Sequence, residues 1–171
     1  MTRRTVREIA AHLIYAMDCT GDSAGEVVDT RMAESYYACL AEENDVYEEK
    51  PNRKQLSYIR GCVSGVAEHR AELDAQIERL AIGWRVSRIA KLTKAILELA
   101  MYEILYVEDV PTAVAINEAV ELTKKYEDAE VAAFVNGVLG AFVRTQEEKT
   151  AEDQETEEAV QGETAEPEAD V

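Results

Sequence analysis

Arginine side chains at the start of the chain are the groups best suited to binding a charged partner. Arg3, Arg4 and Arg7 all lie within the first seven residues. A guanidinium group pairs bidentately with phosphate and stacks on nucleobases, which suits RNA. The alternative is that they only keep the terminus soluble, although cations at a helix N-terminus oppose the helix dipole. The residues alone leave both interpretations open. Three phosphate contacts would give a salt slope of only roughly −2 on a single strand, so specific binding would need a second protein.

A second basic segment follows the middle of the chain and contains the only tryptophan, Trp84. No acid occurs in residues 80–96, and four cations step through this segment at intervals of three: Arg85, Arg88, Lys91 and Lys94. This spacing predicts a slowly drifting row on one helix face. We interpret the row as an RNA-binding edge, whereas Trp84 alone is better explained as a cap on the core at a helix junction.

The charge of the chain is strongly negative, which argues against broad binding to nucleic acid. The formal net charge is −17, and residues 147–171 hold eleven acids and a single lysine. This segment has too few apolar residues to offset its chain entropy, so we expect a disordered acidic tail. The first 146 residues suffice for one domain. Two basic clusters on an acidic body indicate a localised binding surface.

Residues for catalysis or metal binding are sparse. The two histidines, His12 and His69, have no nucleophile arranged near them, and the glycines form no phosphate-binding loop. The cysteines lie at least twenty residues apart, at Cys19, Cys39 and Cys62, which fits neither a zinc site nor a disulfide framework. We expect buried, reduced thiols in a cytoplasmic protein that is not an enzyme, needs no cofactor and does not cross a membrane.

Apolar residues recur with helical spacing along the whole domain, and no segment alternates as a strand would. Leucine, alanine and glutamate are frequent, while glycine and proline are scarce. Asn52 and Gln55 resemble an N-capping pair. The pattern predicts an all-α domain of six or seven helices, the main ones near residues 9–17, 27–40, 52–81, 89–105, 112–126 and 131–142.

Two motifs place polar residues inside apolar helical patterns, in residues 116–122 and 134–139. In the second, Asn136 next to Gly137 either needs a hydrogen-bond partner or permits a close backbone approach near the N-terminal arginines. The motifs occur in order after an Arg-rich start and a central segment that holds Trp84, Arg88 and residues 95–103. Taken together, the chain resembles the NusB family of bacterial transcription antitermination proteins.

This resemblance implies a fold and a function. The family fold is two packed three-helix bundles. Its members bind the boxA sequence of ribosomal-RNA leader transcripts together with NusE, a small-subunit ribosomal protein, and help RNA polymerase read through terminators. The Arg-rich start is the family's main RNA contact, and Tyr15 falls in the region that meets NusE. The RNA-binding candidates are Arg3, Arg4, Arg7, Trp84, Arg85, Arg88, Phe134 and Asn136. Glu98, where relatives commonly have Arg, and the acidic tail depart from the family pattern.

Two other functions remain as alternatives. The chain could be a helical scaffold, or a homodimer that hides its arginines. It could also be a stand-alone relative of the N-terminal domain of ribosomal-RNA cytosine methyltransferases. No methyl-donor domain follows Phe142, which argues against the second of these.

Overall fold

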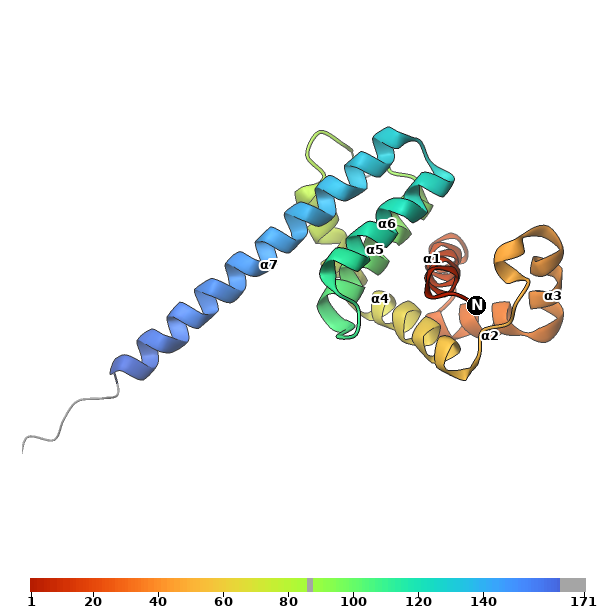
Figure 1. Cartoon of the computed structure of the whole chain (residues 1–171), viewed down its shortest axis with the longest axis horizontal. Coiled ribbons are helices and arrows are strands. Elements are labelled where there is room, and N and C mark those ends of the chain that lie inside the picture. The colour runs from red at the N-terminus through yellow and green to blue at the C-terminus, as the bar shows by residue number, and fades with distance from the viewer. Residues whose placement is uncertain (86–87, 164–171) are drawn as a thin grey trace, which may run out of the picture.

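The computed structural model is built entirely of helices over the residues that it describes, 1–85 and 88–163, so the all-α prediction is confirmed (Figure 1). The helices are α1 (Arg3–Thr20), α2 (Ala24–Met32), α3 (Glu34–Glu43), the short 3-10 helix η1 (Asp45–Tyr47), α4 (Arg53–Leu80), α5 (Lys91–Tyr106), α6 (Thr112–Tyr126) and α7 (Ala129–Glu163). Within this part of the chain no helix is long and apolar enough to cross a membrane.

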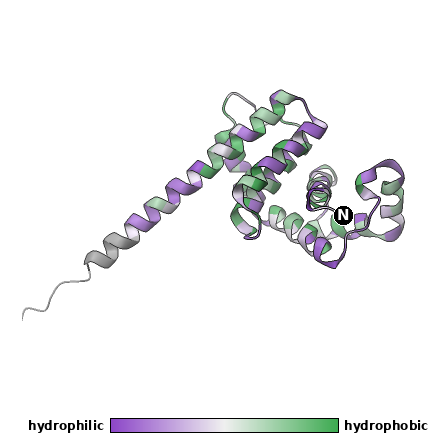
Figure 2. Ribbon diagram, in the orientation of Figure 1, coloured by the Kyte–Doolittle hydropathy of each residue, from purple (hydrophilic) through white to green (hydrophobic). Residues whose placement is uncertain are grey.

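The helices form two groups that share α4. On one side, α1, α2, α3 and the start of α4 pack together, and on the other side α5, α6 and α7 gather around the end of α4 (Figure 1). Contacts of α1 with both α4 and α5 join the two groups into one body. Hydrophobic residues, in green, are frequent on the helices of this body (Figure 2), and many of them form one buried core cluster. The largest fully buried side chains include Ile9, Leu13, Ile59, Leu97, Leu139 and Phe142.

The sequence predicted most helices closely, but it missed one interruption and misplaced a row of cations. The capping box of α4 is present, because Asn52 and Gln55 exchange side-chain and backbone hydrogen bonds. The predicted helix 27–40 is instead two helices, because Ala33 adopts an extended ψ of 139° between α2 and α3. The expected row of four cations on one helix face was also wrong. Arg85 and Arg88 precede α5, and only Lys91 and Lys94 lie on that helix.

A glycine in the middle of α4 allows α5 to come close. A Cβ atom on Gly65 would lie 2.1 Å from the ring of Tyr102, whereas one on Gly61, a turn earlier, would meet nothing within 4 Å. The Tyr102 ring therefore occupies the space that a side chain at position 65 would need. This contact sets the packing distance between α4 and α5.

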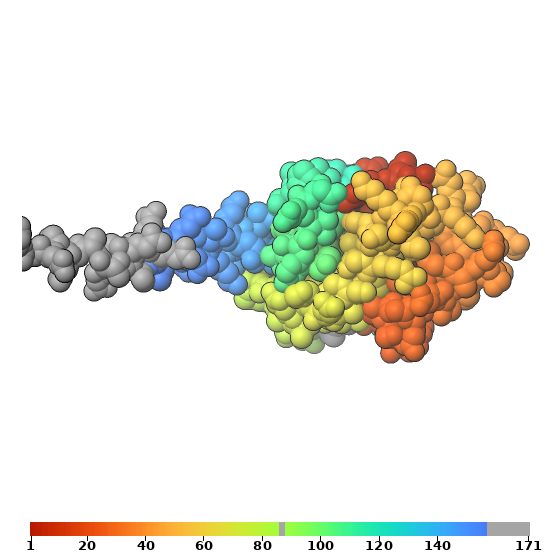
Figure 3. Space-filling view, turned by 90° about the horizontal axis from the view of Figure 1, so that it is seen from below, coloured from red at the N-terminus to blue at the C-terminus, as the bar shows by residue number. Residues whose placement is uncertain are grey.

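Helix α7 projects far beyond the body, and this differs from the disordered tail expected from residue 147 (Figures 1 and 3). The helix continues to Glu163, and its exposed side chains from Glu147 to Thr156 are mainly polar (Figure 2). Alanine, glutamate and glutamine are good helix formers, and the buried start of α7 supplies the costly nucleus. Residues 164–171 lie outside the described part.

Candidate nucleic-acid interface

The N-terminal arginines point in different directions, and Arg7 is buried. Its Nε and Nη2 groups donate to the Glu103 carboxylate of α5 at 2.9 Å, and the Arg7 side chain is only 5% exposed. Tyr58 of α4 donates to the same carboxylate at 2.6 Å. Burial lowers the pKa of Arg7, but Glu103 outweighs this and the pKa is raised. This burial argues against the predicted direct contact of Arg7 with RNA, and the ion pair fixes α1 to the core.

Arg4 is exposed at the tip of α1, next to a carboxylate of α6. Its Nε and Nη2 donate to Glu118 at 2.9 and 2.7 Å, and 60% of its side chain is accessible to solvent. Glu118 also lies 3.6 Å from the Arg7 Nη1 atom. The hydrogen bond from Arg4 is the main reason that the pKa of Glu118 is lowered. The Arg4 fork is thus ordered, charged and open to solvent on one side.

Arg3 is exposed as well, but it turns towards α4 and the connection between α5 and α6. Its Nη1 and Nη2 donate to Asp109 at 3.3 and 3.4 Å, and its guanidinium lies 4.5 Å from the centre of the Tyr58 ring. No acid occurs in the first turn of α1, so its dipole is not offset from within the helix. Asp109 and Glu118 supply that offset from other elements.

The second cluster of candidate residues lies where the α4–α5 connection meets the start of α7. The rings of Trp84 and Phe134 pack 4.7 Å apart, and both are half-buried. Arg88 lines a small pocket of about 90 Å³ beside them, and Arg85 is exposed. Asn136 is also exposed, so it needs no buried partner, and a Cβ atom on Gly137 would meet no described residue within 4 Å. The structure therefore brings Trp84, Arg88 and Phe134 together, with Trp84 capping a helix junction.

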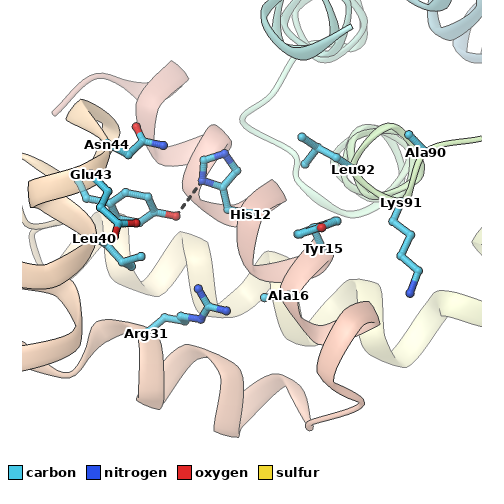
Figure 4. Close-up of a pocket in the computed structure, with 11 residues that line it drawn as sticks. His12, Tyr15, Ala16, Arg31, Leu40, Glu43, Asn44, Ala90, Lys91 and Leu92 are labelled. Atoms are coloured by element: carbon cyan, nitrogen blue, oxygen red, sulfur yellow. Dashed lines mark hydrogen bonds between the residues drawn. The ribbon is translucent and has the colours of Figure 1, made fainter.

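A groove of about 690 Å³ opens between α1, the α2–η1 region and the start of α5 (Figure 4). Tyr15, which is 40% exposed, lies along it with Arg31 and Lys91. His12 bonds the Tyr47 hydroxyl at 2.8 Å and the Tyr126 hydroxyl at 2.7 Å. Burial is the main cause that lowers the pKa of His12, so the ring is neutral at pH 7.

Comparison with known proteins decides the family. The NusB family model matches residues 4–144. The chain belongs to the NusB family. It is 40% identical over 144 residues to the transcription antitermination protein NusB of Acetivibrio thermocellus, covering 84% of this chain and 90% of that protein. The NusB protein of Agathobacter rectalis is 47% identical over 145 residues, which cover 83% of this chain and 99% of the relative.

Solved NusB structures share the fold. The T. maritima NusB structure matches with a TM-score of 0.63 and 26% identity, over 84% of this chain and 92% of the other. A structure of antitermination factors NusB and NusE in complex with dsRNA matches with a TM-score of 0.65 at 24% identity, over 84% and 96%. Family membership makes this chain a transcription antitermination protein, and the family is not one of enzymes. The match spans nearly the full length of these NusB relatives, so the alternative of a methyltransferase N-terminal domain fits the chain less well than NusB does.

Two features of this NusB-family chain could not be located from the sequence pattern. Arg31 was missed because the sequence of α2 predicts only a short amphipathic helix. The Arg31 side chain lines the groove because α2 packs on α1. Lys125, at the end of α6, was missed too. Its Nζ lies 2.8 Å from Glu8 of α1. The cysteine prediction was wrong for Cys19 and Cys39, which are exposed, and right for Cys62.

Glu98, which we expected to depart from the family pattern, is buried in a cluster of charges. It lies 3.4 Å from Arg70 and 3.5 Å from Lys94, and its Oε1 has no hydrogen-bond partner among the described residues. Burial and the nearby Asp74 carboxyl raise the pKa of Glu98 to about 8, against the opposing effect of the two cations. The carboxyl is 2% exposed and separated from the α1 tip, so it does not join the surface arginines.

Proposed function

We propose that this chain binds boxA-type single-stranded RNA in ribosomal-RNA leader transcripts, together with NusE, and that this lets RNA polymerase read through terminators. The observation that carries the proposal is the pair of exposed arginines, Arg3 and Arg4, at the tip of α1 in a NusB-family chain. Such a role places the protein in the cytoplasm, where bacterial transcription takes place.

Charge supports this assignment of the binding surface. The protein carries a net charge of −17, so RNA is repelled from most of its surface and attracted only where cations gather. Beyond Arg4, two exposed cations from other helices lie beside α1. Lys125 at the end of α6 pairs with Glu8, and Lys91 at the start of α5 lies 4.0 Å from Asp18. Trp84 and Arg88 lie beyond, close to Lys91 in the chain. A single strand along α1 could contact phosphates at these cations and stack bases on exposed aromatic rings.

A protein partner is needed for affinity. The cations beside α1, which are Arg3, Arg4, Lys91 and Lys125, are each paired with a carboxylate. Each phosphate contact contributes a salt slope of only about −0.7 on a single strand. The NusB homologue crystallised with NusE and dsRNA provides the model for such an assembly. We propose that NusE docks near the groove at Tyr15, so that RNA and NusE bind side by side.

The test is a binding titration with boxA RNA and a scrambled RNA, each with and without NusE. Changing Arg3 and Arg4 together to Ala should weaken boxA binding several-fold while leaving helicity intact. Arg144→Ala, which removes an exposed cation of α7, is the matched control and should have no effect. Equal binding of the double variant and the wild type would refute the proposal. Light scattering on the same samples separates it from a homodimer that hides the arginines.

A further inference from the structure

A pocket on the α4 side of the N-terminal tip has a composition suited to an anion. It has a volume of about 350 Å³ and lies between the start of α1, the start of α4 and the α5–α6 connection. Such a volume is in the range of small-ligand sites. The N-terminal residues, in red, lie at the surface between the green α5–α6 region and the yellow start of α4 (Figure 3). The pocket is lined by Arg3, Val6, Asn52, Lys54, Gln55, Tyr58 and Asp109.

Two cations from different helices line this pocket. Arg3 comes from the first turn of α1, and Lys54 comes from the first turn of α4, which contains no acid. The Tyr58 ring lies 4.5 Å from the Arg3 guanidinium and holds it in place by a cation–π contact. Lys54 is exposed, and its charge acts on Asp109. One wall is therefore aromatic, and two positively charged side chains line the same pocket.

The Asp109 carboxylate shows what kind of group this site accepts. Its two oxygens receive hydrogen bonds from Nη1 and Nη2 of Arg3, which is the bidentate pattern that an Arg makes with carboxylate or phosphate. The bonds are long, at 3.3 and 3.4 Å, and the Asp109 side chain is 66% exposed. Exposed ion pairs of this kind are weak, so an incoming anion can displace the carboxylate.

The neighbouring arginine makes RNA the best-matched anion. Arg4 points to α6 while Arg3 points to α4, so the two guanidinium groups diverge from adjacent positions on the tip. We propose that the pocket binds a phosphodiester group of the RNA strand that passes over Arg4, with Arg3 and Lys54 as its cations, and that this group displaces Asp109. This inference rests on the proposed function and extends its RNA-binding surface to α4. Lys54 then belongs to the interface, although no sequence motif marked it.

Neighbouring residues of α4 offer a matched pair of variants. Lys54 lines the pocket, whereas the adjacent Arg53 is exposed but does not line it. Lys54→Ala should weaken boxA binding several-fold and make the salt slope shallower by about 0.7, the value for one lost phosphate contact. Arg53→Ala removes the same charge from the same helix turn and should change neither quantity. Equal effects of the two variants would overturn the pocket and leave only a general charge effect.

Removing the competing carboxylate tests the site in the opposite direction. Asp109→Asn should strengthen boxA binding in the wild-type background, and this gain should shrink when Lys54 is already Ala. An unchanged or lower affinity of Asp109→Asn would contradict displacement. If wild-type protein binds boxA and scrambled RNA equally while Lys54→Ala still weakens both, the proposed function fails and the phosphate site stands.

A measurement without RNA tests whether the pocket binds a phosphate group even if the protein binds no RNA. Inorganic pyrophosphate is titrated while the side-chain Nε–H resonance of Arg3 is followed by NMR. A saturable shift that weakens in Lys54→Ala, but not in Arg53→Ala, supports the pocket. The absence of a shift, or the same shift in both variants, overturns it.

Discussion

Replacing Arg7 by Ala distinguishes a buried anchor from an RNA contact. The change would leave the Glu103 carboxylate, which is 0% exposed, without the cation that it bonds at 2.9 Å. Removing one partner of a buried ion pair costs about 3–5 kcal/mol, because the other charge stays buried and uncompensated. The Tyr58 hydroxyl can still donate to Glu103, but one neutral donor does not replace a bidentate guanidinium.

This loss is large enough to measure as a melting temperature. For a domain of this size each kcal/mol lowers Tm by roughly 2–4 °C, so Arg7→Ala should melt roughly 6–20 °C lower. Circular dichroism during heating gives the Tm, and urea unfolding at 25 °C gives the free energy of unfolding. RNA binding is then measured well below the lower Tm.

Arg4→Ala is the control for Arg7→Ala, because it removes an equally basic side chain that is 60% exposed. We expect it to weaken RNA binding with little change in Tm, since exposed pairs contribute little to stability. The reasoning would be refuted if Arg7→Ala kept the wild-type Tm and lost RNA binding as Arg4→Ala does. Arg7 would then be a direct contact, and the ion pair with Glu103 would not stabilise the fold.

Three further changes test other contacts. Glu118→Gln removes the charge that pairs with Arg4, so RNA affinity at low salt should rise several-fold in a fluorescence anisotropy titration, and no rise would contradict the competition. The pKa of Glu98 is raised from 4.5 to about 8, so the folded protein retains a proton that the unfolded chain releases, and the free energy of unfolding should fall as the pH rises between these values. Urea unfolding at several pH values should show this fall, and Glu98→Gln should remove the part that Glu98 contributes. Gly65→Ala should destabilise the protein by about 1–3 kcal/mol in urea through overpacking, whereas Gly61→Ala on the same helix should stabilise it by up to about 1 kcal/mol.

Helical periodicity predicted the fold because it reports burial along each helix. It placed α4 within a residue at each end, since the Asn52 capping box marks its start. It failed at Ala33, where the chain bends without glycine or proline, the residues that usually mark such a break, and where α2 packs on α1 and α4. After residue 146 it gave no sign that α7 continues to Glu163, because the absence of apolar residues argues against a core but not against a helix that extends from one.

For the site, charge showed which arginines lie together but not which of them are exposed. Arg7 lies beside the buried Val6 and Ala10 on the inner face of α1, so its burial follows from the helical period. A second signal was present in α5, where Glu98 and Glu103 interrupt a helix that is apolar nearly all round. A buried acid requires a cation or a proton. Glu103 pairs with the cation of Arg7. Whether Glu98 is neutralised by a cation or by a proton depends on its distances to Arg70 and Lys94, and no sequence pattern provides these distances.

Carboxylates from other helices make the basic tip of α1 compatible with folding, and this limits its affinity for RNA. Arg3 and Arg4 lie in a first turn without acids, where the helix dipole disfavours them, and Asp109 and Glu118 offset that cost. A phosphate can replace these carboxylates because water reaches both pairs. It cannot replace Glu103, because no water would solvate the released charge. Each exchange trades one ion pair for another, so the tip alone gains little free energy from RNA, and a protein partner must supply the rest.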